Sequence, residues 1–404
     1  MPRTVRALWE GQAGGFGETS RTFWYEAFVP DPIASIDPAL PLSTAEAVAE
    51  GERALLDLSG TATLVGLEAM SRQLLRAESV ASSRIEGLSL SHRRLAKAMF
   101  DPAQADRTAR GVVGNISAME RAIELGARAD GIDVAALLEL HRLLFVGTED
   151  ERFAGQIRES QNWLGGSSIN PRRAEFIPPP AAEVRFLLDD LCLFVNRADL
   201  PPVAQAAIAH AQFETIHPFA DGNGRVGRAL IHVILRRRDV ARTYVPPISL
   251  VLVGNGTSYV EGLTLFRAGD LAGWVTRFAH VARDSTVLAR RLCEALAGLQ
   301  ASWRETAGKP RRSSAAQRLI QLLAGRPIVD IPSAATNLGV SYPQAREAVL
   351  RLEAAGVLRQ ATIGRRRNRA WEAPALLDLL DAFESEALTP TRSGQQRRSP
   401  VLRR

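Results

Sequence analysis

Residues 216–228 read IHPFADGNGRVGR, and this stretch separates two apolar runs that favour helices. The run before it, VAQAAIAHAQFETI, leads into Pro218, which cannot continue a helix. The run after it, NGRVGRALIHVILRRR, predicts a second helix that starts near Asn223. A glycine-rich loop therefore lies at a helix N-terminus, where unpaired N–H groups and the helix dipole favour an anion.

The glycines and arginines of this stretch suit a phosphate chain. Gly222 and Gly224 permit positive φ angles and a close approach of the backbone to phosphate oxygens. Arg225 and Arg228 are three residues apart on the predicted helix, so both guanidinium groups can reach one phosphate chain. The plainer alternative is a surface turn with solvated charges, and it leaves this combination of residues unexplained.

Three further side chains complete the predicted chemistry. Asp221 offers a carboxylate that can hold Mg²⁺ beside bound phosphates. His217 titrates near neutral pH and can accept a proton from an incoming hydroxyl. Phe219 is expected to pack into the core and fix the loop. The set predicts transfer of a phosphoryl or nucleotidyl group to a hydroxyl.

The segment HPFADGNGRVGR matches the signature of the Fic family, HxFx(D/E)GNGRxxR, at every specified position. The stretches FVPDP, GQIRESQNWLGG, AEFIPPP and FETIHPF also resemble Fic proteins with an N-terminal extension. The resemblance covers roughly residues 20–290. It implies a mainly α fold with a short β-hairpin flap, ATP as substrate and Mg²⁺ as cofactor. It also implies transfer of AMP to a Ser, Thr or Tyr hydroxyl of a target protein.

The family roles carry over by position. The resemblance makes His217 the base and Asp221 the Mg²⁺ ligand. The residues that would bind the ATP phosphates are Gly222, Asn223, Gly224 and Arg225 for the α- and β-phosphates and Arg228 for the γ-phosphate. The segment 174–178 resembles the flap, whose edge pairs with an extended target segment. Relatives that transfer phosphate depart from the second half of the motif, and this chain does not.

An upstream segment resembles the inhibitory helix of the family. SSRIEG matches the pattern [S/T]xxxE[G/N] through Ser82, Glu86 and Gly87. A carboxylate at Glu86 would satisfy Arg228 and place negative charge where a γ-phosphate would lie. The alternative is an ordinary helix end, with Gly87 beyond its last turn and Glu86 in solvent.

Basic charge is concentrated near the C-terminus. Residues 309–372 hold twelve basic and four acidic residues, a net charge of +8, whereas the whole chain carries +6. The segment IPSAATNLGVSYPQAREAVLRLEAAGVL resembles a winged helix-turn-helix, with Ser341–Glu353 as recognition helix and Gly364–Arg369 as wing. Arg346 and the wing residues Arg365, Arg366 and Arg367 suit contacts with DNA phosphates. The same fold also serves for dimerisation or for docking a target, and both alternatives stay open.

The pattern of the remaining chain predicts the organisation of a globular protein with several domains. Residues 1–22 are expected to be flexible, and His92 is expected at the surface. Helices are expected at 44–58, 64–86, 107–129, 132–145, 181–196, 202–217, 223–238, 257–300 and 315–324. The expected parts are an N-terminal Fic-associated region with the inhibitory helix (1–105), a Fic core (106–300), a winged helix (309–384) and a basic disordered tail (385–404).

The composition favours a cytoplasmic protein. No apolar run reaches the roughly 18–20 residues that cross a bilayer, and the N-terminus lacks a signal peptide. The two cysteines lie in apolar helical contexts, as buried thiols do. Two functions remain in view: an autoinhibited adenylyltransferase, or a DNA-binding regulator whose Fic domain senses nucleotide or modifies only itself. His217 favours the enzyme, since a sensor needs no base, and a homodimer stays open.

Overall fold

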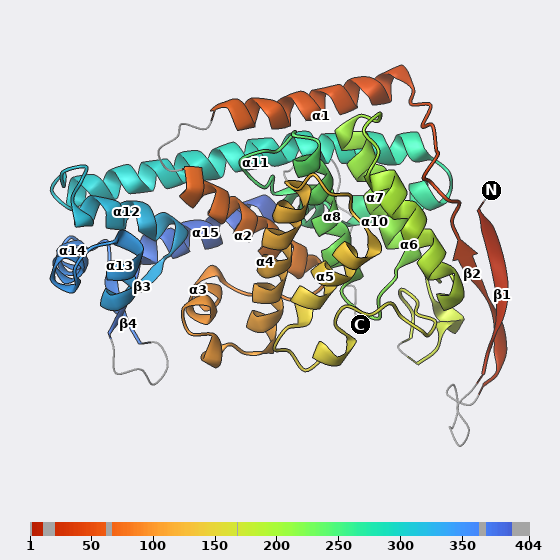
Figure 1. Cartoon of the computed structure of the whole chain (residues 1–404), viewed down its shortest axis with the longest axis horizontal. Coiled ribbons are helices and arrows are strands. Elements are labelled where there is room, and N and C mark those ends of the chain that lie inside the picture. Colours follow the sequence, from red (N-terminus) through yellow and green to blue (C-terminus); the bar gives the residue numbers. More distant parts are fainter. Residues whose placement is uncertain (1, 11–20, 62–66, 168, 363–368, 390–404) are drawn as a thin grey trace.

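The computed structural model describes residues 2–10, 21–61, 67–167, 169–362 and 369–389. Within them the chain is mainly helical, as predicted (Figure 1). The helices are α1 (Leu42–Thr61), α2 (Leu67–Ile85), α3 (His92–Phe100), α4 (Arg107–Gly126), α5 (Val134–Phe145), α6 (Ala181–Val195), α7 (Pro202–Ile216), α8 (Asn223–Arg237), α9 (Ile248–Gly254), α10 (Gly256–Arg267), α11 (Leu271–Thr306), α12 (Ala315–Gly325), α13 (Ile331–Leu338), α14 (Tyr342–Ala354) and α15 (Pro374–Leu388). The strands are β1 (Arg3–Trp9), β2 (Phe23–Val29), β3 (Ile328–Asp330), β4 (Arg359–Ala361) and β5 (Ala370–Glu372).

The pair α7 and α8 forms the centre of the molecule. Every residue of α7 from Val203 to Ile216 is buried, including the polar side chains of Gln205, His210, Gln212, Glu214 and Thr215. In α8 the first thirteen residues are buried, and the helix packs on α4 and α7. The long helix α11 runs along the helical part of the molecule, with α1 beside it (Figure 1). The loop between α7 and α8 is thus held by the most buried helices of the chain.

Several helical segments differ from the prediction, and α9 is one that was not predicted. The helix expected at 257–300 is divided into α10 and α11, because Gly269 has a φ of 88° and Asp270 caps the next helix through the N–H of Gly273 (2.8 Å). The short helix α3 was not predicted, and it buries His92, which is 6% exposed and lies 3.5 Å from Glu384. The prediction of a surface position for His92 is therefore wrong: long-range packing, rather than its two arginine neighbours in sequence, sets its environment.

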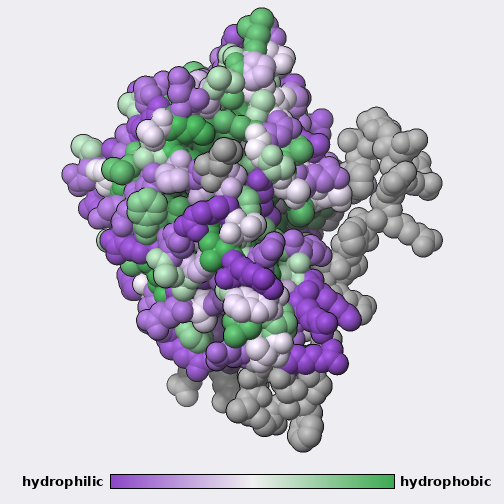
Figure 2. Space-filling view, turned by 90° about the vertical axis from the view of Figure 1, so that its right-hand side faces the viewer, coloured by the Kyte–Doolittle hydropathy of each residue, from purple (hydrophilic) through white to green (hydrophobic). Residues whose placement is uncertain are grey.

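The expected flexibility of residues 1–22 is wrong for part of that range. β1 pairs with β2 in an antiparallel ladder from Arg3 opposite Val29 to Trp9 opposite Phe23. Trp24 is 56% exposed on this hairpin, with the Arg6 guanidinium 4.9 Å from its ring centroid. Figure 2 shows this end of the molecule, where apolar and polar side chains are interspersed. Strand pairing so far from the centre cannot be predicted from the composition of this segment alone.

The C-terminal elements pack on the rest of the chain. A three-stranded sheet of order β3-β5-β4 accompanies α12, α13 and α14. The turn at Gly339 has a φ of 61°, and Ser341 opens α14 with a capping box, as the sequence indicates. The loop with Arg365, Arg366 and Arg367 lies outside the described residues, so the winged helix stays a prediction.

Helix α15 was not predicted. It runs to Leu388, so the first four residues of the tail expected at 385–404 are helical, and residues 390–404 lie outside the described part. Its apolar face, with Leu376, Leu377 and Leu380 buried, packs on α9, α11 and α3. In the part of the chain that the structure describes, no helix is both long enough and apolar enough to span a membrane.

Candidate active site

His217 ends α7 in a left-handed conformation, with φ 50° and ψ 61°. This conformation is uncommon for a residue other than glycine, so the surroundings must hold it. The next residues turn into the core: Phe219 is fully buried and stacks on the ring of His141, with centroids 3.9 Å apart. The expected packing of Phe219 is confirmed.

The glycine loop begins α8. Gly222 has a φ of 81° and stands at the N-cap, so α8 starts at Asn223 as predicted. The Asn223 side chain accepts from the N–H of Phe219 and donates to its carbonyl, both at 2.8 Å. This amide therefore holds the loop, and only the backbone of Asn223 can face an anion. The first N–H groups of α8 have no partner within the helix, which makes this end suited to phosphate.

His141 supports the same loop from α5. The N–H of Gly155 donates to Nδ1 of His141 (2.9 Å), so this histidine carries its proton on Nε2 and donates it to the carbonyl of Asp221 (3.0 Å). Burial lowers the pKa of His141 to about 4, so the ring stays neutral. The Asp221 carboxylate itself is 60% exposed and faces solvent. The sequence alone indicates only that His141 packs inside the protein. Its hydrogen bonds could not be predicted, because Gly155 and Asp221 lie 14 and 80 positions away along the chain.

The two arginines of the motif lie on the inner side of α8. Arg225 is 4% exposed, with its guanidinium 5.2 Å from the ring centroid of Phe145 and 3.7 Å from Asp221. Arg228 is 1% exposed, although it carries a full charge. Buried charges need partners, and those of Arg228 come from α2.

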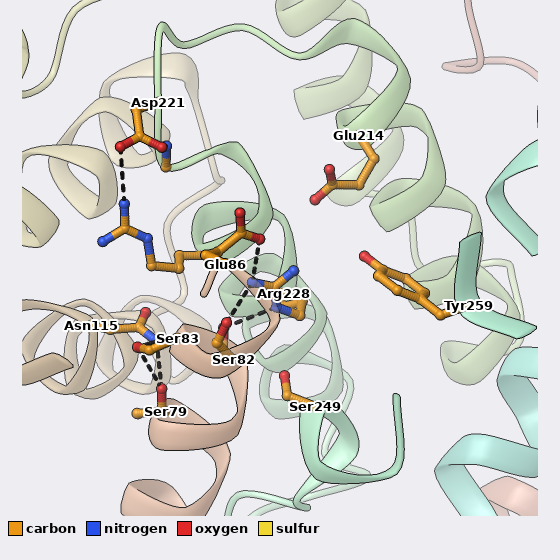
Figure 3. A network of polar contacts seen from close by, with 12 residues as sticks. Ser79, Ser82, Ser83, Glu86, Asn115, Glu214, Asp221, Arg228, Ser249 and Tyr259 are labelled. Carbon is orange, nitrogen blue, oxygen red and sulfur yellow. Dashed lines mark hydrogen bonds and ion pairs between the residues drawn. The ribbon is translucent and has the colours of Figure 1, made fainter. Parts of the chain in front are cut away.

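Ser82 and Glu86 supply these partners. The Arg228 guanidinium donates to Ser82 Oγ (2.9 Å), to the Ser82 carbonyl (2.8 Å) and to Glu86 Oε1 (2.8 Å), as Figure 3 shows. Gly87, with a φ of 80°, ends the segment. Glu86 is therefore not a solvated helix end: it is paired with the second arginine of the motif.

The Glu86 carboxylate also covers the glycine loop. A Cβ atom on Gly224 would lie 1.9 Å from Glu86 Oε1 and 2.7 Å from an Arg228 nitrogen. Glycine at 224 thus gives room to an anion against the backbone, and here that anion is a carboxylate. The expected contact of Glu86 with Arg228 is therefore present, and the inhibitory role of this segment stays a prediction.

A second buried contact holds α2 in this position. Glu78, eight residues before Glu86, accepts from Ser249 Oγ (2.6 Å) and from the Ser249 N–H (2.7 Å), and lies 2.9 Å from His232 Nε2. On another side of α2, Asn115 donates to the Ser79 carbonyl (2.8 Å) and to Ser83 Oγ (3.0 Å) (Figure 3). These contacts fix the helix that carries Glu86 against α4, α8 and α9.

Arg158 and Asn162 connect the histidine to the segment before the flap. Arg158 donates from Nε to the His217 carbonyl (2.9 Å) and also to the carbonyls of Ser160 and Pro179. Asn162 donates to the Phe219 carbonyl (2.9 Å). These donors stabilise the strained turn at His217. The sequence analysis singled out this segment through GQIRESQNWLGG, but it did not predict which atoms the segment contacts.

The flap is a single antiparallel bridge between Leu164 and Phe176. Gly166, with a φ of 73°, lies against the Arg173 carbonyl, where a Cβ atom would come within 2.4 Å. Beside the flap lies β2, since the N–H of Phe28 donates to the Ile177 carbonyl (2.9 Å). In place of the hairpin predicted around 174–178, the described residues form this single bridge, which has the N-terminal hairpin as a neighbour.

Glu214 is a buried carboxyl that the sequence analysis did not single out. It is 6% exposed on α7, its Oε2 lies 4.0 Å from His217 Nδ1, and a Cβ atom on Gly227 would lie 2.6 Å from its Oε1. Burial raises its pKa to about 7, Arg228 opposes the shift, and Glu86 adds to it. Its position three residues before His217 was the feature of the sequence that could have identified Glu214 as a site residue.

The electrostatics keep His217 neutral. Burial lowers its pKa to about 4; Glu86 acts in the opposite direction, whereas Arg158 and Arg267 lower the pKa. A neutral imidazole can accept a proton at physiological pH. Negative phosphates bound nearby would raise its pKa toward the range in which a general base works best.

We expect Glu214→Gln to stabilise the protein at high pH. The native carboxyl holds its proton up to about pH 7, whereas its ordinary pKa is 4.5, so the stability that it provides below pH 4.5 is lost as the pH rises through 7. Glutamine resembles the protonated form at every pH. The free energy of unfolding should therefore rise at pH 8 by an amount on the order of 2 kcal/mol and change little near pH 5, and thermal midpoints at the two pH values measure the change.

Glu149→Gln, at an exposed carboxylate, provides the matched control and should leave both midpoints unchanged. Equal effects of Glu214→Gln at pH 5 and pH 8 would show that Glu214 does not change its protonation state between these pH values, which contradicts a pKa near 7.

The fold and the site define a helical protein with an anion-binding loop at a helix N-terminus, a histidine before it and a carboxylate over it. Residues 131–235 match the Fic/DOC family, and residues 45–124 match the N-terminal part of the Fic/DOC family. The chain therefore contains two segments that match the Fic/DOC family, and the second of them includes the motif.

Two of the relatives, from a worm and a fly, are named after an enzymatic activity. The chain is 30% identical over 218 residues to the protein adenylyltransferase fic-1 of Caenorhabditis elegans, which covers 52% of this chain and 40% of the worm protein. It is 31% identical over 159 residues to the protein adenylyltransferase Fic of Drosophila melanogaster, which covers 39% of this chain and 29% of the fly protein. The chain thus spans less than half the length of these relatives.

A crystal structure of a Fic family protein from Desulfovibrio desulfuricans resembles the whole fold. It covers 91% of this chain and 100% of its own, at 23% identity and with a TM-score of 0.50. This similarity bears out the mainly helical fold.

Proposed function

We propose that the protein is an adenylyltransferase that moves AMP from ATP to a Ser, Thr or Tyr hydroxyl of a target protein and of itself. The observation that carries the proposal is the position of His217, on a strained turn directly before the anion-binding loop. The names of the worm and fly relatives support the same activity. A loop that only bound nucleotide would have no need of a neutral, well-held imidazole at this point.

In the proposed reaction the target hydroxyl attacks the α-phosphorus of ATP. The new bond joins the hydroxyl oxygen to that phosphorus, the bond to the oxygen bridging the α- and β-phosphates breaks, and pyrophosphate leaves. His217 accepts the hydroxyl proton. The backbone at Gly222–Gly224 and the Arg225 guanidinium hold the α- and β-phosphates, and Arg228 holds the γ-phosphate.

Asp221 is the residue of this site that would hold Mg²⁺, because its carboxylate is exposed beside the loop. The ion, bound also by phosphate oxygens, would neutralise charge on the leaving pyrophosphate.

We also propose that Glu86 inhibits the transfer of AMP. Its carboxylate accepts from Arg228 and lies over Gly224, so ATP cannot place its γ-phosphate on Arg228 while this contact persists. In-line transfer requires reacting atoms about 3–3.5 Å apart and aligned. A displaced phosphate chain would therefore cost rate more than affinity.

The test uses the variant Glu86→Gly with Mg²⁺ and two samples of ATP, one labelled at the α-phosphate and one at the γ-phosphate. Adenylylation puts only the α-label on protein, and mass spectrometry should show a gain that matches AMP. Label from the γ-phosphate would instead indicate a kinase, and no label from either sample would refute group transfer. Lysate proteins in the same reaction identify the target.

The alternative of a DNA-binding regulator has less support. Arg351, one of the few polar side chains of the predicted recognition helix, donates to the Ala307 carbonyl (3.0 Å) and is held against the end of α11. Tyr342 and Arg346 remain exposed on α14. The homodimer that the sequence leaves open gains no support from the comparisons.

A salt titration tests this alternative. If the C-terminal segment contacts DNA, affinity for a short duplex should fall steeply with added salt, because phosphate contacts release counterions. Replacing Arg365, Arg366 and Arg367, which lie outside the described residues, should flatten that dependence by about one unit of slope for each lost contact. Binding that ignores salt, or none at low salt, favours a docking role.

A further inference from the structure

A cleft of about 570 Å³ separates α2 and α3 from the C-terminal elements α12, β3 and α13, far from the candidate active site. Figure 1 shows where these elements lie in the fold. Its volume lies in the range that binds small molecules. Its lining includes apolar side chains and three arginines, together with the acids Glu120 and Asp330 and the polar residues Ser333 and Asn337.

Three arginines converge on the cleft from opposite walls. Arg72 and Arg76 are one turn apart on α2, and Arg326 lies across from them between α12 and β3. Arg76 is half-buried and donates to the Gly325 carbonyl (2.7 Å). Burial and the positive charges of Arg72 and Arg326 lower the pKa of Arg76 to about 10, whereas Glu120 acts in the opposite direction. Like charges gathered in a concave site cost free energy that a bound anion would recover.

Two acids, Glu120 and Asp330, line the cleft together with the three arginines. Asp330 is engaged as the cap of α13, where its carboxylate accepts from the N–H of Ser333 (2.8 Å). Glu120 is exposed on α4, where water screens it. The part of the lining that is neither acidic nor basic includes the apolar side chains of Leu75, Met99, Phe100 and Ile328.

We propose that this cleft binds a small organic phosphate, with the phosphate between Arg72, Arg76 and Arg326 and an apolar or aromatic body against Met99 and Phe100. Arginine suits the phosphate because its planar fork donates two hydrogen bonds at once. The apolar lining distinguishes this site from one for inorganic phosphate.

The position of the cleft makes its ligand an effector, a step that rests on the proposed function. Arg72 and Arg76 lie on α2, whose last residue, Ile85, directly precedes Glu86. The C-terminal elements hold both ends of this helix, since Gln73 donates to the Ala324 carbonyl and Arg84 lies 3.1 Å from Glu384. A phosphate bound between Arg76 and Arg326 would strengthen this connection and change how readily Glu86 leaves Arg228.

Calorimetry with phenyl phosphate tests binding independently of activity. Phenyl phosphate should bind the full chain more tightly than inorganic phosphate, because only the former reaches the apolar lining. Arg326→Glu, at an exposed position, should weaken binding at least tenfold, and so should Arg72→Glu. Arg290→Glu makes the same charge change at an exposed arginine of α11 outside the cleft and should leave binding unchanged.

Arg225→Ala is the control for binding of the probe at the glycine loop instead of the cleft. The proposal would be overturned if the heat of phenyl phosphate binding were lost in Arg225→Ala but retained in Arg326→Glu and Arg72→Glu. It would also be overturned if phenyl phosphate did not bind the full chain. Displacement of the probe by a short DNA duplex but not by AMP would also overturn it in favour of a nucleic acid. If binding behaves as expected, phenyl phosphate should alter self-modification in chains with Glu86 and not in Glu86→Gly. Unaltered self-modification would overturn the effector role and leave the site in place.

Discussion

Replacing His217 by alanine in the Glu86→Gly variant is expected to abolish AMP transfer while ATP binding remains nearly intact. The phosphates are to be held by the backbone of the glycine loop and by Arg225 and Arg228, none of which depends on the imidazole. Removal of a general base costs about 10²–10⁴ in rate. Transfer of α-labelled phosphate to protein measures the rate, and calorimetry with ATP measures the affinity.

His280→Ala is the matched control, because this histidine is exposed on α11 and should leave the rate unchanged. The pH dependence of the parent rate gives a second check. Since burial holds the pKa of His217 near 4 in the protein without ATP, kcat/KM should not fall at pH 6.5, where an ordinary histidine becomes charged. Transfer by His217→Ala within a few-fold of the parent would exclude His217 as the base.

The residues that the sequence predicts for the site are those whose roles follow from local geometry. Gly222, Arg225 and Arg228 lie within one loop and two turns of a helix, so spacing along the chain fixes their relation in space. Glu86 is far from them in sequence, and it was found only because SSRIEG resembles a family pattern. Its contact with Arg228 could not have been derived from spacing.

The residues that the sequence missed act through contacts over long separations. Arg158 holds His217 from 59 positions away, and His141 holds Asp221 from 80 positions away. Glu214 lies only three residues before His217, yet its raised pKa depends on burial between α7, α8 and the segment of Glu86. Burial and partner choice are tertiary properties, and a single sequence encodes them without displaying them.

The same reason accounts for the errors in the fold. The division between α10 and α11 has a local signal, Gly269 followed by Asp270, which the apolar period on both sides concealed. The pairing of β1 with β2 has none, because a glycine- and arginine-rich segment is compatible with strand or coil. Helix α15 is apolar on one face, and its partners α9 and α11 decide that this face is buried.

Glu86→Gly is expected to increase AMP transfer strongly, by at least about tenfold, and to appear first as self-modification. The change frees the Arg228 guanidinium and removes the carboxylate from above Gly224, so the γ-phosphate can take its place. Glycine adds no bulk, and position 86 lies beyond the last residue of α2, so the cost in helix stability is small. ATP should also raise the thermal midpoint more in the variant, since the buried Arg228 then depends on the ligand for its counter-charge.

Arg228→Ala separates release of inhibition from a general loosening of the site. Because Arg228 must be present to hold the γ-phosphate, Arg228→Ala should show no gain, and the double variant Glu86→Gly/Arg228→Ala should resemble it. Glu86→Gln keeps the shape and removes the charge, so its activity should lie between those of the parent and Glu86→Gly. Thermal midpoints establish that each variant is folded. If Glu86→Gly stays at the parent rate with His217 and Mg²⁺ present, the contact of Glu86 with Arg228 supports the structure of α2 and does not inhibit the enzyme.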